Sequence, residues 1–186
     1  MVAAGGALSA GCDDPPPPNP AGAFLINFRD SGAECSLASH DAALGTVGAS
    51  GDPELVPNGQ DDSSVECRVE PSGSAFRVSL DLDAGATGVV QVNVTLSADN
   101  TPDAKATGTV IYASKDTAGN AYSSPSATPC EFWVDPDAGQ FVRAGEVWLS
   151  FSCSTLSASG QTCALAESYA AARNCLGASN EDDEES

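Results

Sequence analysis

The chain of 186 residues carries 26 acidic and 7 basic residues, and its formal net charge is -19. A surface of this charge repels phosphate backbones and anionic headgroups, so we expect no nucleic acid partner. The sequence contains no apolar run of the roughly 18 residues that a transmembrane helix needs. About 150 residues remain between the N-terminal segment and an acidic tail, enough for one domain.

The first segment, residues 1–11, is apolar and ends in LSAG directly before Cys12. Small residues at the end of a short apolar run are typical of a secretory cleavage site. The segment resembles the lipobox of bacterial lipoproteins, in which the cysteine sulfur is acylated and the chain is cut just before it. This resemblance implies that Cys12 is lipidated and that its acyl chains anchor the protein to a membrane.

The match departs from the lipobox pattern in two places. Leu8 stands four residues before Cys12, where the lipobox has leucine three before, and no basic residue precedes the apolar run. Either the signal is atypical or Met1 is an internal residue of a longer reading frame. Asp13 and Asp14 resemble an inner-membrane retention signal of Gram-negative lipoproteins. The choice between inner membrane, outer membrane and cell surface stays open.

The lipidation site and a proline-rich linker occupy residues 12–22. The stretch PPPPNP, from Pro15 to Pro20, favours polyproline II, which is a stiff spacer without internal hydrogen bonds. Such a spacer would hold a domain away from a membrane surface. A buried N-terminal strand, or a free cysteine beside an ordinary linker, stays open as the alternative.

A period-two alternation of apolar and polar residues, typical of strands, dominates residues 23–177. Connectors such as EPSGS, DAGATG and DPDAGQ have the composition of hairpin turns and short loops. The pattern predicts an all-β fold, an antiparallel β-sandwich of immunoglobulin-like type with about seven strands. In chain order, the predicted strands contain Phe24–Phe28, Val65–Val69, Phe76–Leu82, Val90–Leu96, Gly108–Ala113, Cys130–Val134 and Val147–Cys153.

The chain has seven cysteines, which argues for an oxidising compartment. If Cys12 carries lipid, an even number remains that can close three disulfides, with the pairing open. A zinc site of cysteine and histidine is not expected, because there is no CxxC and only one histidine, His40. The cysteines assigned to disulfides are Cys35, Cys67, Cys130, Cys153, Cys163 and Cys175.

The C-terminal stretch TCALAESYAAARNC is rich in alanine, and Leu165, Tyr169 and Ala172 recur at helical spacing before Gly177. We predict a short helix here. An unbroken helix would separate the α-carbons of its two terminal cysteines by about 18 Å, too far for a bridge between them. The acidic stretch after it, residues 178–186, predicts a disordered tail.

Two patterns invite a chemical reading that we do not favour. Ser39, His40 and Asp41 are consecutive, whereas the members of a catalytic triad converge from different parts of a fold. The repeated DxDAG is the front half of a calcium loop without its remaining acids, and it is also good turn chemistry. We expect turns and no cofactor, and keep as alternative metal ligands Asp81, Asp83, Asp135 and Asp137.

The two tryptophans, Trp133 and Trp148, lie on the strand faces opposite the cysteines if the alternation holds. We expect the C-terminal segment to cover them. The alternative is an exposed aromatic platform for a glycan or a partner protein.

The sequence therefore predicts a lipid-anchored protein of the bacterial cell envelope with a binding or structural role and no enzymatic activity. It is similar in general features to small secreted lipoproteins of GC-rich bacteria. The expected partners are the membrane, through the anchor, and an envelope protein or glycan. A calcium-dependent or carbohydrate-binding β-sandwich module is the alternative, and an enzyme of unknown type comes third.

Overall fold

The structure is a computed structural model that describes residues 18–30 and 34–177. Within these residues the chain forms twelve β-strands and two short 3-10 helices, and it has no α-helix. The strands are β1 (Ala21–Arg29), β2 (His40–Leu44), β3 (Val56–Pro57), β4 (Ser64–Ser72), β5 (Ala75–Asp83), β6 (Val89–Leu96), β7 (Ala106–Ala113), β8 (Tyr122–Ser123), β9 (Cys130–Trp133), β10 (Phe141–Arg143), β11 (Glu146–Ala158) and β12 (Gln161–Arg173); the helices are η1 (Lys115–Thr117) and η2 (Pro136–Ala138).

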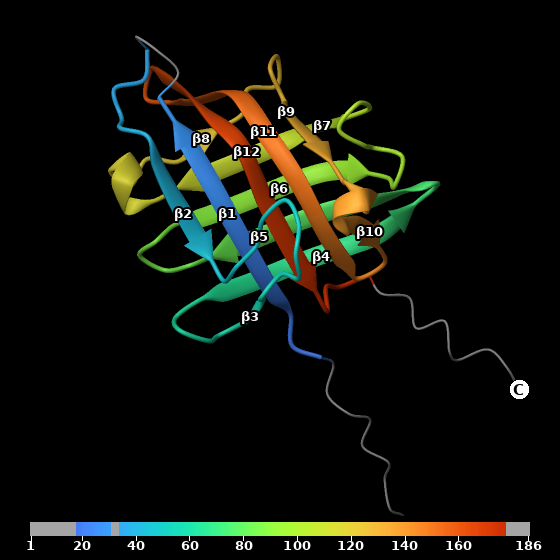
Figure 1. The fold of residues 1–186 in the computed structure, drawn as a ribbon. Coiled ribbons are helices and arrows are strands. Elements are labelled where there is room, and N and C mark those ends of the chain that lie inside the picture. Colours follow the sequence, from blue (N-terminus) through green and yellow to red (C-terminus); the bar gives the residue numbers. More distant parts are fainter. Residues whose placement is uncertain (1–17, 31–33, 178–186) are drawn as a thin grey trace, which may run out of the picture.

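The strands build two packed layers (Figure 1). β2, β1, β12 and β11 form one layer, which crosses in front of the second layer of β7, β6, β5 and β4. The pairing is antiparallel throughout the named strands, and the path is continuous because β8 and β9 each pair with both β11 and β7. We call the layer with β1, β12 and β11 the crossing layer.

Alternation of apolar and polar residues places the core between the layers, as the sequence predicts. On β4, β5 and β6 every second residue is buried, and these residues face the equally buried side chains of the crossing layer. Burial of apolar area of this kind is the main favourable contribution to folding. The polar residues of the same strands point outward.

The all-β, antiparallel character of the prediction is confirmed, but its finer parts are not. The described residues form twelve strands rather than about seven, because the short strands β2, β3, β8 and β10 leave too few residues for a visible alternation. One continuous sheet path is also not the pair of separate sheets that defines the immunoglobulin fold, so that assignment is not supported.

The predicted C-terminal helix is wrong, because the segment is strand β12, paired with both β1 and β11. Its alanines reflect burial and not helix propensity: Ala170, Ala171 and Ala172 are at most 2% exposed, since this central strand packs on both faces. Tertiary packing has overridden local preference. A register shift opposite Cys153 breaks the alternation and lets Leu165 and Tyr169 mimic a helical spacing.

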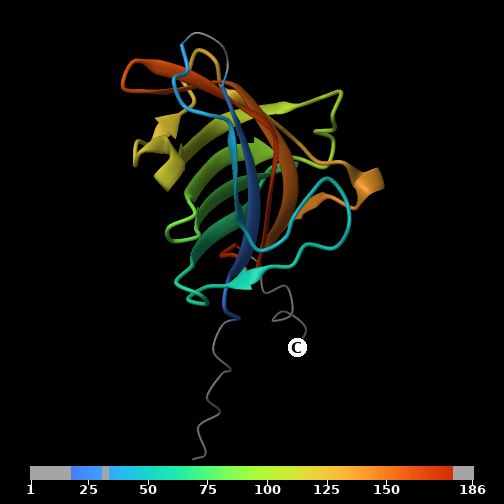
Figure 2. The same ribbon diagram turned by 60° about the vertical axis from the view of Figure 1, so that its left-hand side comes forward.

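Both ends of the described chain lie at one end of the molecule. Ala21 is aligned with Arg173, and the Asn174 side chain donates a 3.0 Å hydrogen bond to the Asn19 carbonyl. Leu176 then adds a short parallel bridge to β4. We call this the terminal end; the β11–β12 turn lies at the opposite, hairpin end (Figure 2).

Candidate functional site

The six cysteines assigned to disulfides form three bridges. Their pairs are Cys35–Cys163, Cys67–Cys175 and Cys130–Cys153, with sequence separations of 128, 108 and 23 residues. The two cysteines that flank the predicted helix do not pair with each other. The bridges instead fix the hairpin end, the terminal end and the join between β9 and β11. Three such bonds indicate an oxidising, extracytoplasmic environment.

Cys12 lies outside the described residues, as do the apolar segment before it, the first half of the proline stretch and the acidic residues 178–186. Its lipidation therefore stays a prediction. The part of the chain that the structure describes has no helix with the length and apolar character of a membrane span.

The four aspartates kept as alternative metal ligands act in turns and in local hydrogen bonds. Asp81 accepts from the Gln91 side chain at 2.8 Å, and Asp83 accepts from the backbone N–H of Gly85 at 2.7 Å. Asp135 caps η2 by accepting from the N–H groups of Asp137 and the following alanine. Among residues 18–30 and 34–177, no three acidic, histidine or cysteine side chains are grouped in a way that would hold a metal ion.

The glycines of the two DxDAG turns adopt the conformation that turn chemistry requires. Gly85 has a φ of 59° and Gly139 a φ of 89°, values at which other residues are strained. Gly139 also lies against the ring of Trp148, where an added Cβ would be 3.4 Å from the indole. Turn formation explains both motifs without a ligand.

Both tryptophans are buried, Trp133 to 7% exposure and Trp148 to 4%. Trp148 lies on the outer face of the crossing layer with Ala23 and Ala171, and a loop of residues 45–55, which we call the cover loop, packs over it. Its indole N–H donates a 3.1 Å hydrogen bond to the carbonyl of Gly48 in that loop.

The expectation that the C-terminal segment covers the indoles is therefore wrong, because that segment is a strand within the sheet. The cover loop is supported from the side by Gln140, which donates to the carbonyl of Ala49 at 3.1 Å and to Ser150 at 2.9 Å. Over Trp133 the ammonium of Lys105 lies 4.6 Å from the ring centroid. These two indoles form no exposed platform.

The only histidine joins the two layers. His40 on β2 stacks on Phe28 at 4.7 Å, and its Nδ1 lies 3.0 Å from the carbonyl of Ala38. A carbonyl only accepts, so Nδ1 carries a proton, and in the neutral imidazole Nε2 accepts from the hydroxyl of Tyr112 at 3.0 Å. The neighbours in sequence go elsewhere: Ser39 binds Asp30, and Asp41 pairs with Arg29.

The same histidine lies 3.4 Å from the hydroxyl of Ser114, a contact that sequence spacing could not reveal. Ser114 caps η1, since its oxygen accepts from two backbone N–H groups. Burial raises the pKa of the Tyr112 phenol; the hydrogen bond with Ser114 lowers it, and the charges of Asp116 and Asp41 raise it further. Tyr112 stays protonated at neutral pH and donates to His40. We interpret the contacts among His40, Tyr112 and Ser114 as structural contacts that hold the two layers together.

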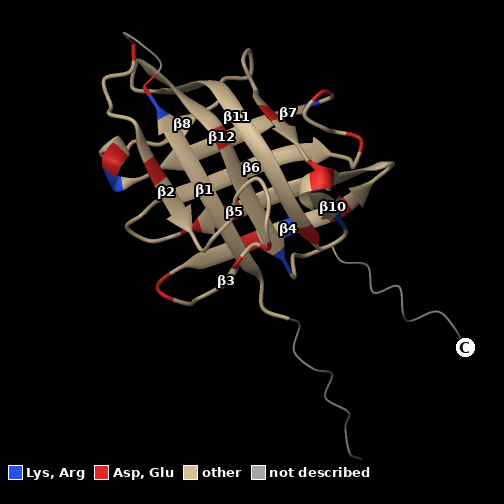
Figure 3. Ribbon diagram, in the orientation of Figure 1, with Lys and Arg blue, Asp and Glu red and all other residues tan. Residues whose placement is uncertain are grey.

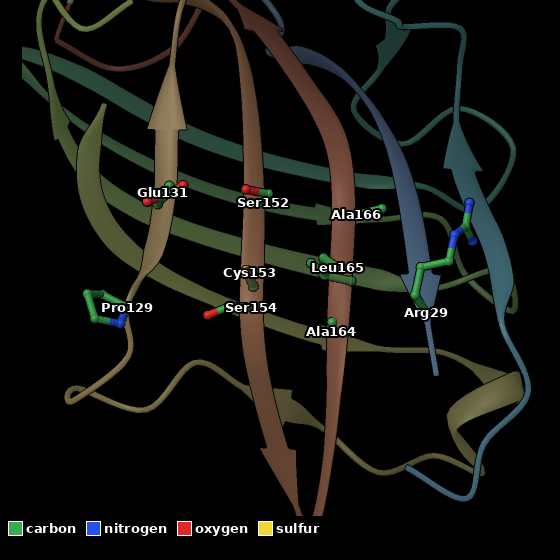
Figure 4. Close-up of a pocket in the computed structure, with 9 residues that line it drawn as sticks. All are labelled: Arg29, Pro129, Glu131, Ser152, Cys153, Ser154, Ala164, Leu165 and Ala166. Atoms are coloured by element: carbon green, nitrogen blue, oxygen red, sulfur yellow. The ribbon is translucent and has the colours of Figure 1, made fainter. Parts of the chain in front are cut away.

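A surface hollow of about 360 Å³ opens on the outer face of the crossing layer (Figure 4). Small side chains form its floor: Ser152 and Ser154 from β11, and Ala164 and Ala166 from β12. Charged side chains stand at its two rims, Arg29 on β1 and Glu131 on β9. Sequence reasoning missed this site, because its members come from four strands.

Each rim of the hollow carries an ion pair. Arg29 pairs with Asp41 at 2.9 Å, and Lys105 pairs with Glu131 at 2.9 Å. The four side chains are between 33% and 59% exposed, so all of them are open to a ligand. Acidic residues elsewhere are dispersed over loops and strands in the view of Figure 3.

A second, shallower groove crosses the outer face of β4, β5 and β6. Arg68, Arg77, Asn93 and Thr95 are among the polar residues that line it. Arg68 is paired with Glu70 at 2.5 Å. The groove lies on the opposite side of the molecule from the hollow.

No family model, curated protein or solved structure significantly matches this chain. The class that the fold and the sites define is an all-β, antiparallel, disulfide-bonded domain of two packed layers with an open hollow on one face.

Proposed function

We propose that this chain is a lipid-anchored domain of the bacterial cell envelope that acts by binding and not by catalysis. The observation that carries the proposal is the use of cysteine. Six of the seven cysteines pair with one another, which leaves Cys12, in the lipobox-like LSAGC, without a cysteine partner in the chain. A covalent lipid gives that sulfur a function in an oxidising compartment.

The arrangement of the ends agrees with a tether at the N-terminus. The described chain enters at the terminal end, where Asn19 is held by Asn174, and Pro20 leads directly into β1. A domain tethered through the preceding proline run presents its hairpin end and its outer faces to the surroundings. The bridge Cys35–Cys163 stiffens that hairpin end.

Binding is favoured over catalysis by the environment of the histidine. A general base needs a partner whose proton it can take while a substrate lies within reach. Nε2 of His40 instead accepts from Tyr112, a residue with 0% exposure, and the nearby Ser114 oxygen is used as a helix cap. The hollow with its charged rims is the surface best suited to a partner.

Membrane fractionation of cells that express the Cys12→Ser variant tests the anchor. We expect the unchanged protein in the membrane fraction and the variant in the soluble fraction. The two proteins should have the same melting temperature. A serine substitution at the buried pair Cys130–Cys153 serves as the contrasting control, because it should lower stability and leave anchoring intact. Membrane retention of Cys12→Ser would contradict the proposal.

A carbohydrate-binding role is the second candidate, and the groove on β4–β6 favours it. The groove combines guanidinium, amide and hydroxyl groups, with Arg77 and Thr95 aligned across neighbouring strands. Sugar hydroxyls bind such donors and acceptors. Glycan-array binding that is lost in Arg77→Gln and kept in Arg173→Gln would support this role; equal loss in both variants would count against it.

A further inference from the structure

The charges on the two sides of the hollow form an antisymmetric pattern, in which each charge on one side has a counterpart of opposite sign on the other. Across the crossing layer the strands run β2, β1, β12 and β11, and the pairing continues through β9 to β7 of the second layer. Asp41 lies on β2 and Arg29 on β1; on the other side Glu131 lies on β9 and Lys105 directly precedes β7. The order of signs is therefore minus, plus, floor, minus, plus. Read from the opposite side, every sign is reversed.

A dimer with a twofold axis can pair the opposite charges of such a pattern. If the axis runs parallel to the strands and passes between β12 and β11, a second copy lies face to face with its rims exchanged. Each charge then lies over a charge of opposite sign. An axis perpendicular to the strands and in the same plane would instead bring like charges together.

We propose that the hollow binds a second copy of this chain about the axis parallel to the strands. Arg29 pairs with the partner's Glu131, and Lys105 pairs with the partner's Asp41. The reciprocal contacts follow from the symmetry. The interface is isologous, so the dimer closes and does not grow into a filament.

The dimensions of the hollow agree with this arrangement. Arg29 and Glu131 are three strand intervals apart, or about 14 Å at the usual spacing of neighbouring strands. Arg29 is aligned with Ala164 and Glu131 with Ser152, so the two charges are offset by about two residues, roughly 7 Å along the strands. An extended arginine side chain spans that offset.

The floor permits the close approach that the rims need. Ser154 and Ala166 are exposed, and neither side chain extends far from the sheet. Sheets that pack face to face are about 10 Å apart when larger side chains interdigitate. A floor of serine and alanine lets the charged rims of the two copies meet before the floors collide.

The role of this orientation at a membrane rests on the proposed anchor. An axis parallel to the strands leaves the terminal ends of both copies on the same side, so both lipid tethers reach one membrane. Tethering raises the effective concentration of the second copy, and a contact that is weak in solution becomes substantial at the membrane. The surface itself does not depend on the anchor, and it is tested without it.

Sedimentation equilibrium of the full-length Cys12→Ser chain, over a range of concentrations, tests the surface in solution. We expect a reversible monomer–dimer equilibrium that weakens with salt. Arg29→Glu and Glu131→Arg should each weaken dimerisation at least tenfold, and the double variant should recover most of the loss. Arg143→Glu, which removes an exposed ion pair outside the hollow, should leave dimerisation unchanged.

A second measurement detects the dimer contact if it is too weak to be observed in solution. Ser152→Cys places a thiol near the axis, and a short bifunctional maleimide should crosslink it to a second copy in membranes of expressing cells. Ser79→Cys, on the outer face of β5, is the matched control and should not crosslink.

A monomer in solution together with no self-crosslink at position 152 would overturn the proposal. A dimer whose dissociation constant is unchanged by both charge reversals would also overturn it. A crosslink only to a different protein would also overturn it. Failure of the anchor would appear separately, as a charge-dependent dimer found in the soluble fraction.

Discussion

The outer face of the crossing layer has two halves that differ in side-chain size and in what lies over them. Toward the terminal end, the large indole of Trp148 lies among apolar neighbours that include Leu25 and Phe141, and the cover loop packs on this cluster. Toward the hairpin end, the floor of the hollow is serine and alanine, and it stays open. A large apolar surface is unfavourable in water, whereas small side chains leave little to bury.

The comparison shows why sequence reasoning singled out the tryptophans as an alternative binding surface and missed the hollow. Tryptophans attract attention as binding residues, yet here they are the part of the face that the chain covers for itself. The small residues between charged rims have no recognisable motif, and they remain accessible to a partner. We therefore expect substitutions in the covered half to affect stability and those in the open half to affect association.

The largest difference should come from Trp148→Ala compared with Ser154→Ala on the same strand. Removal of the buried indole should cost about 3–5 kcal/mol of unfolding free energy, since it leaves a cavity under the cover loop. The exposed serine should change it by no more than about 0.5 kcal/mol. Denaturant unfolding with the disulfides intact measures both. Similar effects for the two variants would show that the halves do not differ.

Loss of the Cys35–Cys163 bridge should come next. This bond closes a sequence separation of 128 residues at the hairpin end, beside the open half. Replacing both cysteines by alanine should cost about 2–4 kcal/mol, mainly because the unfolded chain gains freedom. The melting temperature in the oxidised state checks the effect. An unchanged melting temperature would mean that the hairpin end is held by other contacts.

The smallest effect concerns Tyr169 in the covered half. Burial raises its pKa to about 12, and the neighbouring Glu167 adds to the shift by hydrogen bonding and by charge. The folded state therefore keeps the phenol proton that the unfolded state loses above its ordinary pKa of 10.0. Stability from this group is complete below that value and is lost as the pH rises toward 12.

Ultraviolet titration of the phenolates checks this shift, with Tyr169→Phe as the control. The variant should lack one late-titrating tyrosine and should lose less stability than the unchanged protein between pH 10 and 12. Titration of all tyrosines near pH 10 would contradict the burial of this ring by the cover loop.

Much of the sheet could be predicted from the sequence, for identifiable reasons. Strands β4, β5 and β6 alternate cleanly because one face is buried and the other is wet, and their predicted spans agree with the structure. Strand β12 could not be predicted in this way. It is central and packed on both faces, so its alanines carry no alternation, and only the pairing with β1 and β11 defines it.

The candidate site was less accessible to sequence reasoning. The six cysteines other than Cys12 predict three bridges, but the partners depend on which strands the fold brings together. The hollow has no local signal at all, because Arg29 and Glu131 are about a hundred residues apart in sequence and only the order of strands brings them to the two rims of one hollow. The contact of His40 with Tyr112 is hidden in the same way.

The proposed membrane anchoring, and with it the placement of two copies on one membrane, depends on the tether at Cys12. Mass spectrometry of the native protein, digested without reductant, tests that tether most directly. We predict an N-terminal peptide that begins at Cys12 and carries acyl chains, together with peptides joined as Cys35–Cys163, Cys67–Cys175 and Cys130–Cys153. An unmodified peptide that spans Gly11 and Cys12, or a disulfide from Cys12 to another cysteine, would contradict it.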